Sequence, residues 1–285
     1  MEVEEKTNNG STFIIKEMPK ILDSKWYRAL RVVLPILLII LFVTWWTMTP
    51  DGVFAKPAAL GYPFCHEIPS HSLTLGGQPL PICARCTGMY LAVAVSLIAL
   101  AFNGPRTRYP AWKFIAIFAV FFVLFAVDGV NSLISTAFHK EVLYTPSNWL
   151  RLFTGAGMGM LIPVALLPLF NQSLWAETDP RPILTKWSEV LGLILLSALI
   201  ALAAATDVPA IVVPLAYLSV IIIPVLLALC YATLWVMLTR TENRYHGWKD
   251  AWLPLVVGFI FAFIQIGLFS WMRYSMTGTW GGFQL

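Results

Sequence analysis

The chain has 285 residues, of which 58% are hydrophobic and only 12% are charged, and its mean hydropathy is +0.74. A soluble domain carries about 25% charged residues, so this composition indicates an integral membrane protein and excludes the ordinary soluble enzymes. The formal net charge is +4, but the basic residues stand in short segments between apolar stretches, which is typical of membrane topology and not of a nucleic-acid-binding face.

The N-terminal region changes from polar to apolar near residue 32. Residues 1–31 mix charged and amide side chains without a sustained apolar face, which predicts a polar cytoplasmic tail with a short interfacial helix near 21–30. The first apolar stretch, about 32–48, ends at Trp45 and Trp46, and Trp gathers at headgroup boundaries. A small-x-small sequence follows at Val53-Phe54-Ala55 and makes a cleaved signal peptide the alternative. Its distance from the apolar core favours an uncleaved span.

Six further apolar windows of about twenty residues follow, at 83–102, 111–133, 150–170, 187–205, 210–238 and 251–272. The sequence therefore predicts an all-α polytopic transmembrane helix bundle of about seven spans. We divide it into the tail at 1–31, a four-span module at 32–172 and a three-span extension at 173–285. Four prolines within the windows predict kinks and not breaks, because neighbouring helices can bond the freed carbonyls: Pro163, Pro168, Pro214 and Pro224.

Lys and Arg divide unequally between the two sides of this bundle. With the N-terminus inside, the tail and the loops 103–113, 171–187 and 239–250 hold fourteen of the nineteen basic residues. Five then lie outside: Lys56, Arg85, Lys140, Arg151 and Arg273. Positive charge concentrates on the cytoplasmic side, so we expect an N-in, C-out topology with the lipid bilayer as the main partner.

The longest connection between the expected spans, Thr49 to Ile82, is rich in Pro and Gly. A connection of that length inside a compact bundle is usually functional, and its composition predicts an ordered, turn-rich cap that we place at 49–88. The predicted topology puts this cap on the extracytoplasmic side, where disulfides persist.

The cap holds most of the reactive side chains of the protein. Cys83 and Cys86 stand three residues apart where the second span begins, on one face of a first helical turn, and the helix dipole with Arg85 favours thiolate there. Cys65 and His66 lie upstream. Three thiols and one imidazole suit a tetrahedral site for zinc or another soft metal.

Two alternatives to a metal stay open for these cysteines. One is a disulfide or redox pair formed by Cys83 and Cys86, and the other is a set of unligated structural thiols. The odd number of cysteines expected outside the membrane disfavours a closed disulfide framework.

A second polar group is expected at the same level of the membrane. Asp128 is the only carboxylate deep within an expected span, and an intramembrane acid needs a partner. Asn131 follows it at i+3, and Asn148, Arg151 and Thr154 repeat that spacing where the next span begins. We expect Asp128 to pair with Arg151 beside the cap, either as a structural ion pair or in support of the site's chemistry.

Other polar or small residues within the spans suggest packing and not chemistry. Gly155 and Gly159, four residues apart, predict close approach of two helices. Cys230 stands in an all-apolar helix and is expected to be an inert packing residue. Gln265, in the last span, is expected to bond to a neighbouring helix. The sequence contains no phosphate-binding loop, dinucleotide fingerprint or HExxH motif, so we expect no organic cofactor.

Four motifs of this chain resemble the prokaryotic family of predicted membrane proteins catalogued as domain of unknown function (DUF) 2085. They are CHEIPSH at 65–71, LPICARCTGMY at 80–90, Asp128-Gly129, and SN-x2-R-x2-TG at 147–155, and the resemblance covers about 60–165. It implies a protein of a prokaryotic cytoplasmic (inner) membrane and no established activity. The family usually has Gln at the position of Glu67 and Arg at that of His71, so His66 takes precedence over His71 as a metal ligand.

Three functional hypotheses follow. The first is a multi-pass membrane protein with an extracytoplasmic zinc site at Cys65, His66, Cys83 and Cys86, next to an intramembrane Asp/Arg pair. The second is a membrane thiol-disulfide oxidoreductase that uses the CxxC pair with Cys65 as the exchanging thiol. The third is a transporter or a structural subunit of a membrane complex.

The sequence does not decide whether the protein is an enzyme. Its candidate catalytic residues are Cys83, Cys86, Asp128 and Arg151. Four further polar residues are expected to support them: Arg85, Asn131, Asn148 and Thr154.

Overall fold

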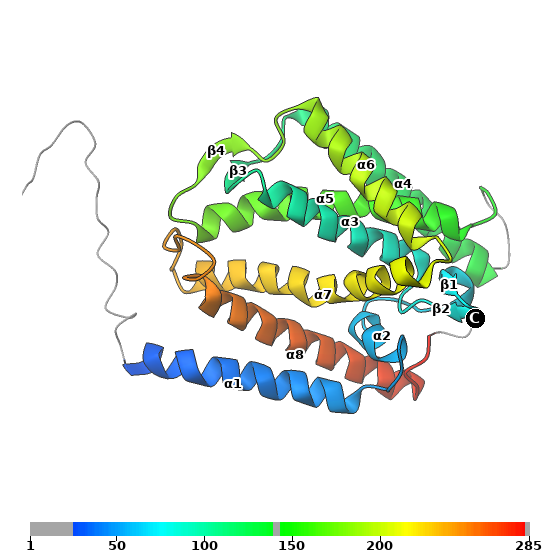
Figure 1. Ribbon diagram of the computed structural model, residues 1–285, viewed down its shortest axis with the longest axis horizontal. Coiled ribbons are helices and arrows are strands. Elements are labelled where there is room, and N and C mark those ends of the chain that lie inside the picture. The colour runs from blue at the N-terminus through cyan, green and yellow to red at the C-terminus, as the bar shows by residue number, and fades with distance from the viewer. Residues whose placement is uncertain (1–24, 139–142, 283–285) are drawn as a thin grey trace, which may run out of the picture.

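The structure is a computed structural model that describes residues 25–138 and 143–282 (Figure 1). In chain order its helices are α1 (Lys25–Met48), α2 (Ala55–Gly61), α3 (Ala84–Ala101), α4 (Trp112–Phe138), α5 (Asn148–Leu174), α6 (Trp187–Ala204), α7 (Pro209–Leu238) and α8 (Trp252–Thr277). The shorter elements are the 3-10 turn η1 (Pro69–His71) and the strands β1 (Thr74–Leu75), β2 (Gln78–Pro79), β3 (Arg106–Arg108) and β4 (Asp179–Pro182).

Seven of the described helices, all except α2, are long and apolar enough to cross a membrane. This confirms the all-α polytopic bundle, and the chain is a multi-pass membrane protein. The helix bounds lie within a few residues of the expected windows. The largest differences at a C-terminal end are in α4, which continues to Phe138, and in α8, which continues to Thr277. In these last turns the Thr136 hydroxyl donates to the Ser132 carbonyl and the Thr277 hydroxyl to the Arg273 carbonyl.

The first helix, α1, begins earlier than expected and includes the end of the predicted N-terminal tail. This helix already begins at Lys25 and is continuous to Met48, so the last part of the expected tail belongs to the first helix. The rest of the tail, and with it the beginning of the expected interfacial helix, lies outside the described residues. α5 and α7 likewise run unbroken through their internal prolines, which agrees with the expectation that these residues do not end the helices.

α3 is the central helix, with its most extensive contacts to α5 and further contacts to α7 and α6. Glycines allow α3 and α5 to touch along their backbones. A Cβ atom on Gly155 would stand 2.0 Å from the Arg85 carbonyl oxygen, and one on Gly159 would stand 2.1 Å from that of Met89. From the other side, a Cβ on Gly88 would stand 2.0 Å from the Leu152 carbonyl oxygen. The close helix approach predicted from Gly155 and Gly159 is confirmed.

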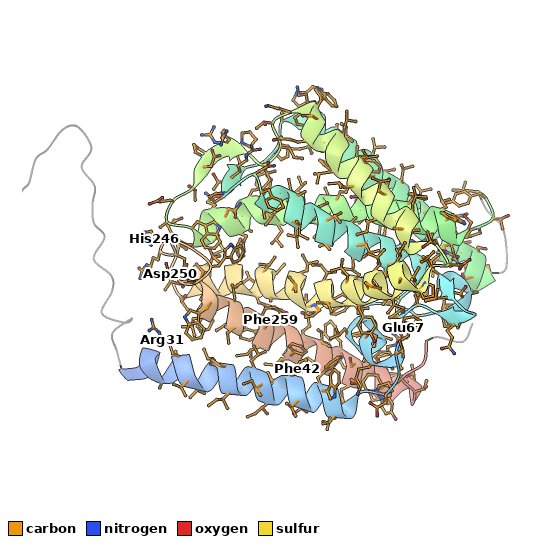
Figure 2. The ribbon with its side chains drawn as sticks, in the orientation of Figure 1. Arg31, Phe42, Glu67, His246, Asp250 and Phe259 are labelled. Atoms are coloured by element: carbon orange, nitrogen blue, oxygen red, sulfur yellow. The ribbon has the colours of Figure 1, made fainter. Side chains whose placement is uncertain are left out.

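The connection before α3 forms the expected turn-rich cap. α2, η1 and the β1–β2 hairpin follow one another there, and Gly76 and Gly77 turn the hairpin with φ values of +58° and +81°. In Figure 1 the cap lies at the same end of the bundle as the C-terminal end of α8. β3, β4 and the connection from α7 to α8 lie at the opposite end, and Figure 2 shows Glu67 at the first end and His246 and Asp250 at the second.

Candidate metal centre and its polar surroundings

The fold brings Cys65, His66 and Cys83 together. Each offers one ligand atom, and the three atoms lie within 4.8 Å of one another. Cys65 follows α2 in a turn closed by its own N–H, which donates to the Gly61 carbonyl at 2.8 Å. Cys83 is the N-cap of α3, and its N–H donates to Cys65 Sγ at 3.2 Å. This bond joins the middle of the cap connection, at Cys65, to the start of α3.

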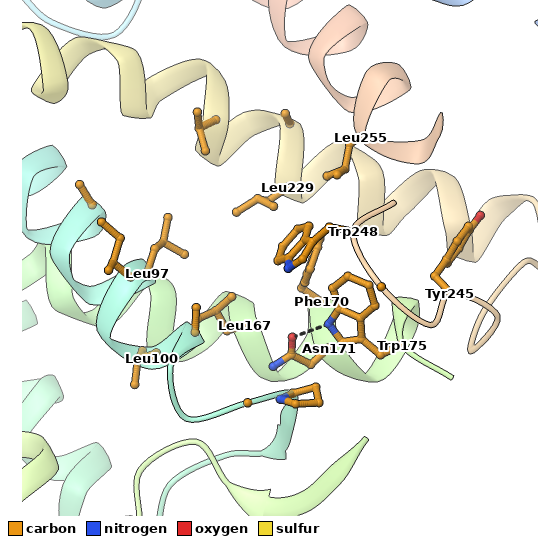
Figure 3. Close-up of a pocket in the computed structure, with 18 of the residues that line it drawn as sticks. Leu97, Leu100, Leu167, Phe170, Asn171, Trp175, Leu229, Tyr245, Trp248 and Leu255 are labelled. Carbon is orange, nitrogen blue, oxygen red and sulfur yellow. Dashed lines mark hydrogen bonds between the residues drawn. The ribbon is translucent and has the colours of Figure 1, made fainter. Parts of the chain in front are cut away.

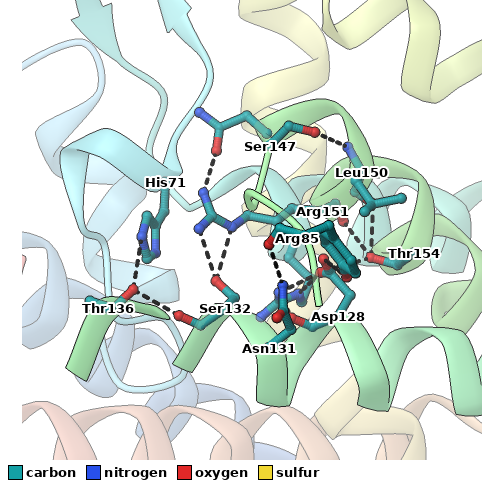
Figure 4. Close-up of polar contacts among 12 residues, drawn as sticks. His71, Arg85, Asp128, Asn131, Ser132, Thr136, Ser147, Leu150, Arg151 and Thr154 are labelled. Atoms are coloured by element: carbon teal, nitrogen blue, oxygen red, sulfur yellow. Dashed lines mark hydrogen bonds and ion pairs between the residues drawn. The ribbon is translucent and has the colours of Figure 1, made fainter. Parts of the chain in front are cut away.

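The two ring nitrogens of His66 have different surroundings. Nδ1 lies 4.0 Å from Cys65 Sγ, whereas Nε2 is 2.9 Å from Nδ1 of His71. Nε2 of His71 lies in turn 3.4 Å from the Thr136 hydroxyl of α4 (Figure 4). A metal-binding imidazole usually has its second nitrogen bonded in this way, which orients the ring. His71 is not one of the three converging residues, in line with the precedence given to His66.

Cys86 lies one turn after Cys83 on α3 and packs against the same buried group of side chains as Cys65 and Cys83. Its sulfur is not among the three ligand atoms within 4.8 Å of one another. Hydrogen bonds from the Cys65 and Cys86 thiols hold the pKa of Cys83 well below its usual value, while the bond with Cys83 and burial raise the pKa of Cys65. Without a cation, the cluster thus favours a single thiolate at Cys83.

The chemistry of this donor set fits a soft divalent cation. The Cys65 and Cys83 side chains are 3% and 1% exposed, and all four cysteines are free thiols. Several thiolates crowded at a buried site repel one another, and a bound dication removes that repulsion. Thiolate and imidazole together are the ligands that structural zinc sites use. Such an ion, once bound, would join the loop at Cys65 and His66 to the first turn of α3.

Glu67 follows the cluster in an unusual backbone conformation, with a φ of +52°. One of its carboxyl oxygens is buried and makes no hydrogen bond within the described part of the chain. Burial raises the pKa of Glu67 to about 8, and the charge of Arg273 opposes this rise in part. Glu67 is therefore mostly protonated at neutral pH.

Arg273 of α8 holds the cap loop from the far end of the sequence. Its guanidinium donates to the carbonyls of Tyr62 and Cys65, and at 3.3 Å to that of His66. It also lies 4.0 Å from the centre of the Tyr62 ring. From the sequence, Arg273 was expected only as one of the five external cations. The available signal was an isolated charge near the end of an apolar helix, which needs a partner.

The partner of Asp128 differs from the expected one. Arg85 donates to Asp128 Oδ2 from Nε at 3.1 Å and from Nη2 at 2.5 Å, and Arg151 does not reach the carboxylate (Figure 4). The expected Asp128–Arg151 pair is therefore wrong. The close contact of α3 with α5 places Arg85 against α4. Tyr144 and Thr154 also donate to the Asp128 carboxylate, at 2.9 and 3.2 Å.

Arg151 forms hydrogen bonds that support the cap and does not bind the Asp128 carboxylate. It donates to the Ser132 hydroxyl at 2.8 Å and to the Asn148 side-chain oxygen at 2.8 Å. The Asn148 amide in turn donates to the carbonyls of Ser70 and Ser72 in the cap, both at 3.1 Å. Arg151 is 5% exposed, so this chain of bonds runs from the interior of the bundle to the loop that holds His71.

The other residues singled out in the sequence have structural contacts. Asn131 donates to the Tyr144 carbonyl at 2.9 Å and accepts from the Leu143 N–H at 3.1 Å, which holds residues 143 and 144 next to α4. Gln265 accepts a hydrogen bond from Tyr231 at 2.7 Å, so the expected bond between helices is confirmed. Cys230 is half-buried on α7 and is not one of the three converging ligand residues.

Comparisons with known proteins locate these features within a recognised segment. Residues 65–165 match the family described as "Predicted membrane protein (DUF2085)", which confirms the resemblance seen in the motifs. An uncharacterised protein of Methanocaldococcus jannaschii is 29% identical over 116 residues, which is 40% of this chain and 67% of that protein. No solved structure matches the chain. The family match contains the Cys/His cluster and the Arg85–Asp128 pair, and Arg273 lies beyond it.

Proposed function

We propose that this chain is a zinc-binding protein of a prokaryotic cytoplasmic membrane, in which Cys65, His66, Cys83 and Cys86 hold one zinc ion on the extracytoplasmic side. The observation that carries the proposal is the convergence of the Cys65, His66 and Cys83 ligand atoms within 4.8 Å at a buried position. Structural zinc sites are tetrahedral and closed by four protein ligands. Cys86, one helical turn after Cys83, is the fourth.

A closed Cys3His set favours a structural role for the zinc. The ion would join the cap loop to the start of α3. Two other helices already hold this loop: Arg273 of α8 donates to the Cys65 carbonyl, and Asn148 of α5 donates to the Ser72 carbonyl. We propose accordingly that residues 32–172 form a four-span module and that the three-span extension at 173–285 braces its cap. The Arg273 contacts with the cap support this division of roles.

The distribution of charge supports the proposed sidedness. The cap lies at one end of the bundle, and the basic connections around β3, β4 and 239–250 lie at the other (Figure 1). A topology reporter fused after Asn103 or Asn171 should behave as cytoplasmic, and one placed at 55–62 should behave as external. The opposite labelling would overturn the assignment of sides.

Elemental analysis of the purified chain tests the metal. We expect about one zinc per chain, which Cys83→Ser and Cys86→Ser should remove or strongly weaken because each deletes a thiolate ligand. His66→Ala should also weaken binding, and His71→Ala should do so less because His71 acts only through His66. Cys230→Ser, on α7 and outside the cluster, is the matched control. Stoichiometric zinc in both Cys83→Ser and Cys86→Ser would contradict the site.

One observation favours thiol-disulfide exchange as a second candidate function. The pKa of Cys83 is lowered at the N-terminus of α3, and Cys86 lies one turn away, as in reactive CxxC pairs. Thiol counting under non-reducing conditions separates the two functions. A Cys83–Cys86 disulfide in metal-free purified protein would favour the redox function, whereas thiols that become reactive only after zinc is removed would favour the structural one.

A further inference from the structure

A cavity of about 670 Å³ lies at the end of the bundle away from the cap, between α3, α5, α7 and α8 (Figure 3). Its wall is mainly apolar and includes Leu97, Leu167, Phe170, Leu229 and Leu255. The side chains that can ionise or bond strongly come from the end of α5 and the connections beside it: Asn171, Glu177, Tyr245 and His246. An apolar cavity offers water too few hydrogen-bond partners, so its natural occupant is apolar.

The cavity has the depth of one leaflet of a bilayer. Along α7 its wall runs from Leu218 to Leu229, which corresponds to about 16 Å at the helical rise per residue. The hydrocarbon core of a bilayer is about 30 Å thick, so one leaflet contributes about half of that distance. On the other three helices the wall includes Ala101 at the end of α3, Asn171 near the end of α5 and Leu255 near the start of α8. The cavity therefore extends inward from the ends of these spans over a length comparable to that of a single acyl chain.

The mouth of the cavity has the character of a headgroup region. Trp175 and Trp248 pack edge to face with ring centres 5.0 Å apart, and the Trp175 indole N–H donates to Asn171 at 3.0 Å. Amphipathic indoles of this kind gather at the level of lipid headgroups. Both rings line the cavity, so a chain inside would enter between the headgroup level and the bundle core.

The charge near the mouth indicates the kind of headgroup. The three connections at this end, 103–113, 171–187 and 239–250, carry eight basic and four acidic side chains. Arg244, which precedes the wall residue Tyr245, has a buried guanidinium nitrogen without a hydrogen-bond partner among the described residues. Basic pockets between transmembrane helices bind anionic lipid headgroups.

We propose that this cavity binds one acyl chain of an anionic phospholipid, with the headgroup at the connections that carry Pro105, Glu177 and His246. The site is separate from the Cys/His cluster and does not depend on a bound metal. It gives the bundle a bound lipid at the end away from the cap, and it would make that end sensitive to the lipid composition of one leaflet.

Native mass spectrometry of the full chain in detergent tests the proposal, with phosphatidylglycerol and phosphatidylcholine as the added lipids. We expect one phosphatidylglycerol per chain to be retained in preference to phosphatidylcholine. Leu229→Trp and Leu97→Trp should abolish this retention, because each places an indole in the cavity from a different helix. Leu234→Trp is the matched control, since Leu234 lies on the same helix as Leu229 and is 51% exposed.

Three results would overturn the proposal: equal lipid retention by both cavity variants and the control, no retained lipid in the wild-type chain, or equal retention of phosphatidylcholine. In case the two cavity-filling variants do not fold, a second measurement uses chains in which neither Leu97 nor Leu229 is replaced. Phosphatidylglycerol with brominated acyl chains should quench tryptophan fluorescence of the wild-type chain saturably, and Trp248→Phe should remove part of that quenching. Quenching that does not saturate would contradict a discrete site.

Discussion

At the cap end of the bundle α3 and α5 touch backbone to backbone at Gly88 and Gly155, whereas at the opposite end the same two helices line a cavity with larger side chains such as Leu97 and Phe170. The close end also holds the polar side chains that need fixed geometry, including the Arg85–Asp128 pair. The difference indicates that small residues bring the helices together where hydrogen bonds must be aligned. Large apolar residues are sufficient where the helices only enclose an apolar cavity.

The largest effect is expected from breaking the buried ion pair at the cap end. Asp128→Asn leaves the Arg85 charge without its acid, which costs about 3 to 5 kcal/mol for a well-buried pair and somewhat less here, because Arg85 is 17% exposed. Adding Arg85→Leu should restore part of the loss, because the orphaned charge is then gone. Denaturant or thermal unfolding in detergent measures both changes.

Two controls isolate this pair. Adding Arg151→Leu to Asp128→Asn should give nearly additive losses, since Arg151 bonds to Ser132 and Asn148 and not to the acid. Asp179→Asn, which breaks the solvent-exposed pair with Arg181, should change stability little, because solvent screens such a pair. Strong coupling of Asp128 to Arg151, and none to Arg85, would contradict the assigned pairing.

The next largest effect is expected from separating the two helices that touch. Gly155→Ala adds a methyl group 2.0 Å from the Arg85 carbonyl oxygen, so α3 and α5 must move apart, and overpacking of this kind costs about 1 to 3 kcal/mol. The same substitution at Gly267, which has open space around its Cα, is the control. Gly267→Ala should be neutral or slightly stabilising, because Ala favours the helix. Equal effects at the two glycines would show that the helices do not meet there.

A smaller effect is expected from releasing the cap from α8. Arg273→Met keeps the length and apolar contacts of the side chain but removes its hydrogen bonds to the Tyr62 and Cys65 carbonyls, at a cost of about 2 kcal/mol. Zinc should also leave the variant faster when a chelator is added, because the loop that carries two ligands is less restrained. Arg240→Met, at the other end of the bundle, should leave zinc release unchanged. The same release rate in both variants would mean that the extension does not brace the cap.

The spans and the cap could be predicted from sequence because hydropathy and turn residues are local signals. The convergence of Cys65 and His66 with Cys83 was also within reach, since thiols and imidazole have few other reasons to gather in one connection. The pairing of Arg85 with Asp128 was not, because it depends on how α3 rotates against α5, and helical spacing made Arg151 look equally suitable.

Two further features depend on contacts that no local pattern reveals. Arg273 reaches the cap across more than two hundred residues of sequence, so only the packed fold shows which carbonyls it binds. The cavity is equally hidden, because Leu97 and Leu229 look the same in sequence whether their neighbours fill the space between them or not. Its position depends on how α3, α5, α7 and α8 pack against one another, which the sequence of no single helix reveals.

X-ray absorption spectroscopy at the zinc edge of the purified wild-type chain tests the central claim most directly. The proposed site predicts a first shell of sulfur ligands at about 2.3 Å with one nitrogen ligand at about 2.0 to 2.1 Å, in the ratio that Cys65, Cys83, Cys86 and His66 supply. In Cys86→Ser the sulfur count should fall by one. A shell made of oxygen and nitrogen alone, or a sulfur count that Cys86→Ser leaves unchanged, would contradict the account.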